Sequence, residues 1–121
     1  MGIDIYRVYD YPTPDLGLRI LVDRLWPRGI RKTDAPIDKW MKDIAPSSEL
    51  RKWYSHEPQK WDEFKKRYYE ELAAHQPLID ELIAYAQSGD LVLVYSSREH
   101  ERNNAQALKA YLENKIQSEA P

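Results

Sequence analysis

Two arginines and a tryptophan fall within five residues at the end of an apolar segment. Arg24, Trp26 and Arg28 lie in the string Val22-Asp23-Arg24-Leu25-Trp26-Pro27-Arg28-Gly29, which overlaps and follows a predicted strand over residues 18–25. A guanidinium group forms paired hydrogen bonds with a phosphate or a carboxylate. In α/β proteins, ligands bind beyond the carboxyl ends of the strands. The string therefore predicts that Arg24 and Arg28 hold the charge of a small anion.

A second group of polar side chains follows the apolar run over residues 91–95. This run has the length and composition of a strand that is covered on both faces. A helix is predicted from about Asn103 to Gln117, and its first turn offers backbone N–H groups and a dipole that favour an anion. If the two strands are parallel, both polar segments lie at one edge of the sheet and form one pocket. The predicted ligand-binding residues are Arg24, Trp26, Arg28, Tyr95, Ser96, Arg98 and Asn103.

Each of these residues also has a structural interpretation. The serines and asparagines of residues 96–104 can simply cap the last helix, with Arg98 solvated. Trp26 is either a stacking surface for a ring or base, or a core aromatic that closes the end of the sheet. Asp23 and Arg24 are neighbours on the predicted strand, so they should point to opposite faces. Asp23 is then interpreted as a structural partner of a neighbouring arginine.

No catalytic residue stands out. The chain contains no cysteine, which excludes a thiolate nucleophile, a disulfide framework and thiolate metal ligands. Its three histidines lack the spacing of paired metal ligands. Three alternatives stay open for the catalytic group of a hydrolytic reaction: Ser96, a water activated by His56, or an unidentified metal. Whether the protein is an enzyme is left open, and no cofactor or metal site is assigned.

Composition restricts the class of partner. The 121 residues include 18 lysines and arginines against 20 acidic residues, a formal net charge of −2. Non-specific nucleic-acid binders usually carry a basic excess, so nucleic acid is not favoured as a partner. A content of 42% hydrophobic and 12% aromatic residues predicts one folded domain over residues 1–121. No signal peptide or membrane span is expected, which favours a cytoplasmic location. The oligomeric state is not predicted.

The spacing of apolar residues predicts an α/β fold. Strands are expected over residues 3–9, 18–25 and 91–95, with turn residues at 10–17. Helices are expected over residues 36–44, 47–54, 58–75, 77–88 and 103–117. This order predicts a small mixed, partly parallel β-sheet sandwiched by α-helices in a single domain.

The same residues resemble a known family. The resemblance rests on residues 22–29, Ala45-Pro46-Ser47, Leu50-Arg51-Lys52-Trp53, Leu93-Val94-Tyr95 and Asn103. The chain resembles the DUF488 family, in its short, bacterial YeaO-like branch. The resemblance covers nearly the whole chain, and the family name implies no defined activity. Its members tend to have histidines at the positions of Arg102 and Asn104, and a longer branch has a cysteine at that of Tyr95. Arginine and asparagine do not titrate near neutral pH, so proton transfer by histidine at these positions is excluded.

The sequence therefore predicts a binder of a small anionic or phosphate-containing ligand at the C-terminal ends of the strands. Enzyme activity on that ligand is left open. Two alternatives stand beside this hypothesis. One is a nucleic-acid-associated module, in which the same arginines contact phosphates. The other is a scaffold or interaction protein with no small ligand, because four tryptophans and nine tyrosines offer an apolar surface to a partner.

Overall fold

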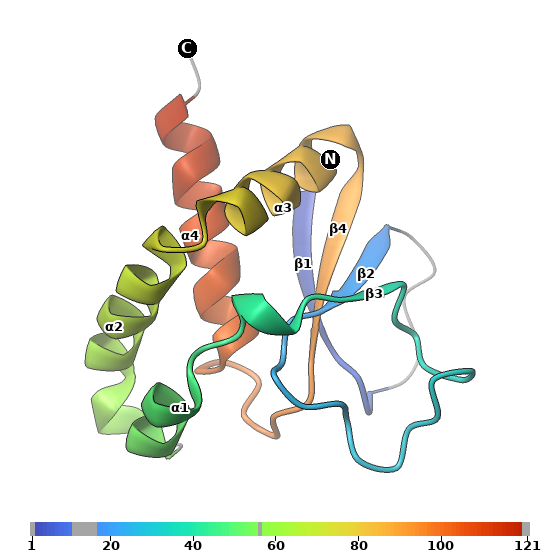
Figure 1. Cartoon of the computed structure of the whole chain (residues 1–121), viewed down its shortest axis with the longest axis horizontal. Helices are drawn as coiled ribbons and strands as arrows, with labels where there is room; N and C mark the ends of the chain where they lie inside the picture. Colours follow the sequence, from blue (N-terminus) through green and yellow to red (C-terminus); the bar gives the residue numbers. More distant parts are fainter. Residues whose placement is uncertain (1, 11–16, 56, 120–121) are drawn as a thin grey trace.

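A four-stranded β-sheet forms the centre of the computed structural model, which describes residues 2–10, 17–55 and 57–119 (Figure 1). The strand order is β1-β4-β2-β3, and the three pairings are all parallel. The central strand β4 is buried from Leu91 to Tyr95, as its continuous apolar run predicts. The strands are β1 (Gly2–Arg7), β2 (Leu18–Leu21), β3 (Lys39–Trp40) and β4 (Asp90–Tyr95).

All four α-helices lie on one side of this sheet, with α3 and α4 directly against the strands and α1 and α2 packed on the other helices (Figure 1). On that face, Ile20 and Leu93 contact a core that includes Tyr68 and Leu108. None of the described helices is long and apolar enough to cross a membrane. The helices are α1 (Ser48–Tyr54), α2 (Trp61–Ala73), α3 (Gln76–Ser88) and α4 (Asn104–Glu119), with short 3-10 turns at Lys42–Ile44 and Pro58–Lys60.

The segment between β2 and β3 covers the other face of the sheet. Leu21 and Val94, which alternate with the core residues along their strands, pack there against Trp26, Ile37 and Trp40. The α/β class with a small, parallel-paired sheet is confirmed. Helices were expected on both faces of the sheet. The second face is instead covered by this segment, whose aromatic side chains bury the strands.

Two predicted elements differ from the structure. The second strand ends at Leu21 rather than at residue 25, and the side chain of Leu25 is 62% exposed. The predicted helix over residues 36–44 is wrong, because β3 and a 3-10 turn replace it. Trp40 packs on one face of the sheet and Ile44 on the other, so this segment passes around the sheet edge in an extended form. The predicted turn over 10–17 lies largely outside the described residues.

Gly17 enters β2 in a conformation that requires glycine. Its φ is +89°, and a Cβ atom there would lie 2.7 Å from the carbonyl oxygen of Asp90. We expect Gly17→Ala to lower the free energy of unfolding by about 2–3 kcal/mol, through backbone strain and this collision. Gly29 is a matched control, because its φ is +80° but no atom lies within 4 Å of its Cβ position.

Chemical denaturation of both variants separates the two causes. Gly29→Ala should cost only the backbone strain, about 1 kcal/mol. Equal losses from the two substitutions would show that the contact between Gly17 and Asp90 is unimportant.

Candidate functional site

The register of β2 and β4 brings two loop segments together at one edge of the sheet. Leu21 pairs with Val94, and the backbone N–H of Val22 donates to the Val94 carbonyl at 3.0 Å. Asp23, which follows Val22, and Ser96, which follows Tyr95 at the end of β4, are therefore neighbours. The sequence predicted that both polar segments lie at one edge of the sheet if the two strands are parallel. The strands are parallel, which confirms this expectation.

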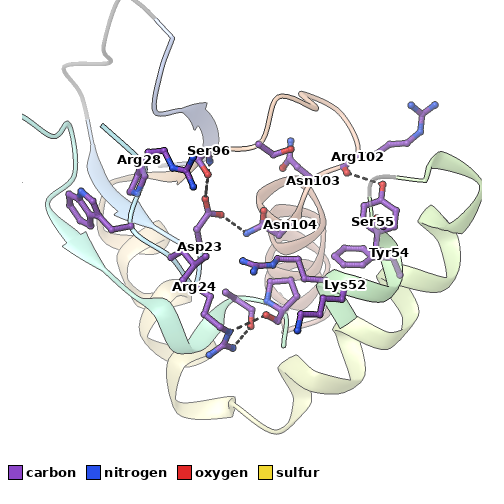
Figure 2. Close-up of a pocket in the computed structure, with 18 of the residues that line it drawn as sticks. Asp23, Arg24, Arg28, Lys52, Tyr54, Ser55, Ser96, Arg102, Asn103 and Asn104 are labelled. Atoms are coloured by element: carbon purple, nitrogen blue, oxygen red, sulfur yellow. Dashed lines mark hydrogen bonds between the residues drawn. The ribbon is translucent and has the colours of Figure 1, made fainter. Parts of the chain in front are cut away.

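Asp23 is the centre of a hydrogen-bonded cluster at this edge (Figure 2). Its Oδ2 accepts hydrogen bonds from the backbone N–H of Ser96 at 2.9 Å and from the Ser96 hydroxyl at 2.8 Å. The Nδ2 of Asn104, the first residue of α4, donates to Asp23 Oδ1 at 3.0 Å and to the Val22 carbonyl at 3.1 Å. The cluster joins the ends of two strands to the start of α4.

A cavity of about 570 Å³ opens over this cluster. Its volume falls in the range of sites for small-molecule ligands. The walls come from residues 23–28, from Ala45 and Pro46, from α1 and its end, and from Phe64 on α2. Residues 96–97 and 102–104 complete it. The two regions predicted from the sequence thus line one cavity.

Cationic side chains dominate the charge of this cavity. Five line it, whereas Asp23 is the single acidic residue among the described lining residues. The side chains of Arg28, Arg51 and Lys52 are exposed and form no hydrogen bond or ion pair within the described part of the chain. Because the whole chain carries a net charge of −2, this excess of positive charge is local. The five cationic residues are Arg24, Arg28, Arg51, Lys52 and Arg102.

Arg24 differs from the other cations because its guanidinium group supports the cavity wall. Its Nη2 donates to the Ala45 carbonyl at 3.0 Å, and its Nε donates to the Pro46 carbonyl at 3.3 Å (Figure 2). These bonds hold the loop after β2 against the segment that leads into α1. Arg24 therefore has fewer donors left for a ligand than Arg28.

Trp26 lines the cavity but is held by the protein itself. Its indole N–H donates to the Ile30 carbonyl at 2.6 Å, and its ring meets Trp40 edge-on with 5.5 Å between centroids. It also packs against the cluster on the second face of the sheet. These contacts favour the interpretation of Trp26 as a core aromatic over that of a stacking surface.

The remaining predicted ligand-binding residues differ in whether they line the cavity. Asn103 lines the cavity but is only 3% exposed, and its side chain caps α4 by accepting from the Gln106 N–H at 2.8 Å. Tyr95 is buried in the core and Arg98 is exposed, and neither lines the cavity. Of the seven predicted residues, the structure brings Arg24, Trp26, Arg28, Ser96 and Asn103 together.

Burial is the main electrostatic influence on Asp23. It raises the pKa of the Asp23 carboxyl above the ordinary value of an aspartate, because the charged form loses hydration. The hydrogen bonds from Ser96 and Asn104 and the charge of Arg51 act in the opposite direction on this pKa. The donors around Asp23 favour its ionised form and burial disfavours it, and burial has the larger effect on this pKa.

Sequence reasoning missed the part of the cavity that α1 supplies. Arg51, Lys52 and Tyr54 line it, and Tyr54 donates from its hydroxyl to the Arg102 carbonyl at 3.0 Å. The amphipathic pattern of α1 was a usable signal, because inward Leu50 and Tyr54 leave Arg51 and Lys52 on its outer side. His56 lies outside the described residues. In the described ranges, no group of three histidines or carboxylates could hold a metal ion.

Fold and site together define a parallel α/β domain with a cationic cavity at the carboxyl edge of its sheet. Residues 2–121 match a family described as the inactive DUF488-N3 subclade, and the chain belongs to that family. The resemblance to DUF488 proteins is therefore confirmed.

Three relatives are similar to this chain. YeaO of Escherichia coli is 44% identical over 112 residues, which cover 93% of this chain and 97% of YeaO. Rv3073c of Mycobacterium tuberculosis and Mb3100c of Mycobacterium bovis are each 56% identical over 70 residues. That aligned segment covers 58% of this chain and 59% of each mycobacterial relative. No solved structure gives a significant match.

Proposed function

We propose that this protein binds a small anionic, phosphate-containing ligand in the cavity and catalyses no reaction on it. The observation that carries this proposal is the charge of the lining, which includes five cationic residues and a single carboxylate. Two of the five have partners in the protein, because Arg24 binds backbone carbonyls and Arg102 pairs with Glu99 at 3.8 Å. Arg28, Arg51 and Lys52 retain their donors, so they are available to an anion. Arginine forks and a lysine ammonium are the groups that proteins use to bind phosphate.

Binding without catalysis is supported by the chemistry of the lining. Among the described lining residues there is no histidine, and the Ser96 hydroxyl donates a hydrogen bond to Asp23 within the protein. Asp23 in turn accepts three hydrogen bonds from Ser96 and Asn104, which stabilise its carboxylate form. The family's description as an inactive subclade agrees with this proposal.

Nucleic acid is not favoured as the partner of this protein. The cations line a concave cavity rather than an extended groove, and the net charge of −2 opposes a long polyanion. A single small ligand fits this arrangement better.

Isothermal titration with pyrophosphate at 50 mM and 200 mM salt tests the proposed function. We expect one binding site and a modest loss of affinity at the higher salt concentration. Single-stranded DNA and RNA oligonucleotides serve as the comparison, because a nucleic-acid binder loses affinity steeply with salt. Oligonucleotide binding that is tighter than pyrophosphate binding and steeply salt-dependent would favour the alternative. Absence of binding by pyrophosphate, by inorganic phosphate and by phosphate esters such as ribose 5-phosphate would overturn the proposal.

The different surroundings of Arg24 and Arg28 lead to a paired prediction. Arg24→Ala should lower the free energy of unfolding by about 1–3 kcal/mol, because the Ala45 and Pro46 carbonyls lose a charged donor. Arg28→Ala should leave the melting temperature nearly unchanged and weaken pyrophosphate binding about fivefold to tenfold, because its side chain is exposed. Thermal melting and titration of both variants check the pair. A stable Arg24→Ala protein, or an Arg28→Ala protein with unchanged affinity, would contradict these assignments.

A further inference from the structure

Asp23 lines the cavity and retains one unused acceptor position. A carboxylate accepts about four hydrogen bonds through its two oxygens. Oδ2 accepts two, both from Ser96, and Oδ1 accepts one, from Asn104. Within the described part of the chain, Oδ1 therefore has room for one further donor. Because Asp23 lines the cavity, that donor can come from a ligand.

The surrounding charges restrict which donor fits this position. A phosphate dianion has no proton to give and is repelled by the carboxylate. An ammonium group is repelled by the five cations that line the same cavity. A hydroxyl group carries no charge and donates one hydrogen bond, so it satisfies Oδ1 without either penalty.

Apolar surface is concentrated beside these polar groups. Within the described residues, the exposed large hydrophobic side chains are Leu25, at 62%, and Tyr9, at 43%, and both line the cavity. The Tyr9 hydroxyl donates to the Arg28 carbonyl at 2.8 Å, which fixes the tyrosine beside a cation of the rim. Exposed apolar side chains at a concave site favour a ligand with a flat or apolar part.

We infer that the ligand class is a mononucleotide, with its phosphate at Arg28, Arg51 and Lys52, a sugar hydroxyl at Asp23, and its base against Leu25 and Tyr9. This inference rests on the proposed function and extends it. Asp23 is then the residue that selects a hydroxylated ligand over a simple anion. Leu25 is the residue that distinguishes a nucleotide from a free sugar phosphate.

Titration with four probes tests the inference on the unmodified protein. The probes are adenosine 5′-monophosphate, 2′,3′-dideoxyadenosine 5′-monophosphate, ribose 5-phosphate and inorganic phosphate. We expect adenosine monophosphate to bind most tightly, and loss of both hydroxyls to weaken binding about tenfold, the value of a hydrogen bond to a charged acceptor. Ribose 5-phosphate should bind about tenfold more weakly than the nucleotide, because it lacks the base.

Two substitutions and one control show which residues contact the hydroxyl groups and the base of the ligand. Asp23→Asn should abolish the preference for the hydroxylated nucleotide, whereas Asp38→Asn should keep it. Asp38 is a matched control because its carboxylate pairs with Arg19 and does not line the cavity. Leu25→Ala should weaken adenosine monophosphate and leave ribose 5-phosphate unchanged. Leu25 is exposed, so this variant keeps its fold even if Asp23→Asn does not.

The outcomes separate the inference from the proposed function. Equal affinity of the two nucleotides, a hydroxyl preference that survives Asp23→Asn, or ribose 5-phosphate binding as tightly as the nucleotide would each overturn the inference. Binding of inorganic phosphate without binding of any sugar phosphate would also overturn it and leave the proposed function intact. Failure of all four probes and of pyrophosphate would overturn both.

Discussion

Reversing the charges of Arg51 and Lys52 should weaken pyrophosphate binding about a hundredfold or more. The double substitution Arg51→Glu and Lys52→Glu places two carboxylates where two exposed cations line the cavity. Each unit charge near a bound anion contributes about 1 kcal/mol or more at such a surface, and four units change. Isothermal titration measures the loss. The melting temperature should fall only moderately, because both side chains are exposed but Arg51 attracts the Asp23 carboxylate.

A matched control separates the cavity from the overall charge. Lys65→Glu and Lys66→Glu change the net charge of the chain by the same amount on α2, and neither residue lines the cavity. We expect this control to weaken pyrophosphate binding only severalfold, through long-range repulsion that salt screens. An equal loss from both double substitutions would show that the anion is attracted by the whole molecule rather than held in this cavity.

Phe64→Ala should lower the free energy of unfolding by about 3–5 kcal/mol, as truncation of a large buried side chain does. Phe64 is 2% exposed, and its ring stacks on Tyr54 with 4.5 Å between centroids and on Trp61 at 5.6 Å. Urea denaturation measures the loss. Phe64→Leu is the control and should cost much less, because most of the buried volume is retained. A loss below about 1 kcal/mol for Phe64→Ala would show that this stack is not part of the cooperative core.

This aromatic stack matters for function because it positions α1. The helix has only seven residues, so packing rather than intrinsic propensity must stabilise it. Ser47 caps it and also binds Glu71 of α2, through its N–H at 2.8 Å and its hydroxyl at 2.6 Å. Phe64→Leu should therefore retain anion binding, since α1 still holds Arg51 and Lys52 at the cavity.

Much of the fold follows from local sequence patterns. The apolar run of β4, the Ser47 cap and the apolar stripe of α2 each specify one element without reference to the rest of the chain. Predicting the shared edge needed one further assumption, that β2 and β4 pair in parallel. The segment 36–44 could not be predicted in this way. Its apolar residues have helical spacing, yet they contact opposite faces of the sheet.

The site was harder to predict because its roles depend on long-range contacts. Arg24 and Arg28 belong to the same string, but only Arg24 meets carbonyls 21 and 22 residues further along the chain. Asp23 was expected to point away from Arg24, as neighbours on a strand do. The strand ends at Leu21, so the alternation no longer applies, and both residues line one cavity. The partners of Asp23 are Ser96 and Asn104 rather than a neighbouring arginine.

An NMR titration of amide-labelled protein with pyrophosphate shows whether the cavity holds a small anion. We expect saturable shifts confined to the amides of residues 23–26, 28, 51–52, 54–55, 96–97 and 102–104, which line the cavity. The amides of the basic stretch 65–67 on α2 should not shift. Shifts spread over the basic residues of the whole surface, or no shifts at the carboxyl edge of the sheet, would contradict the account.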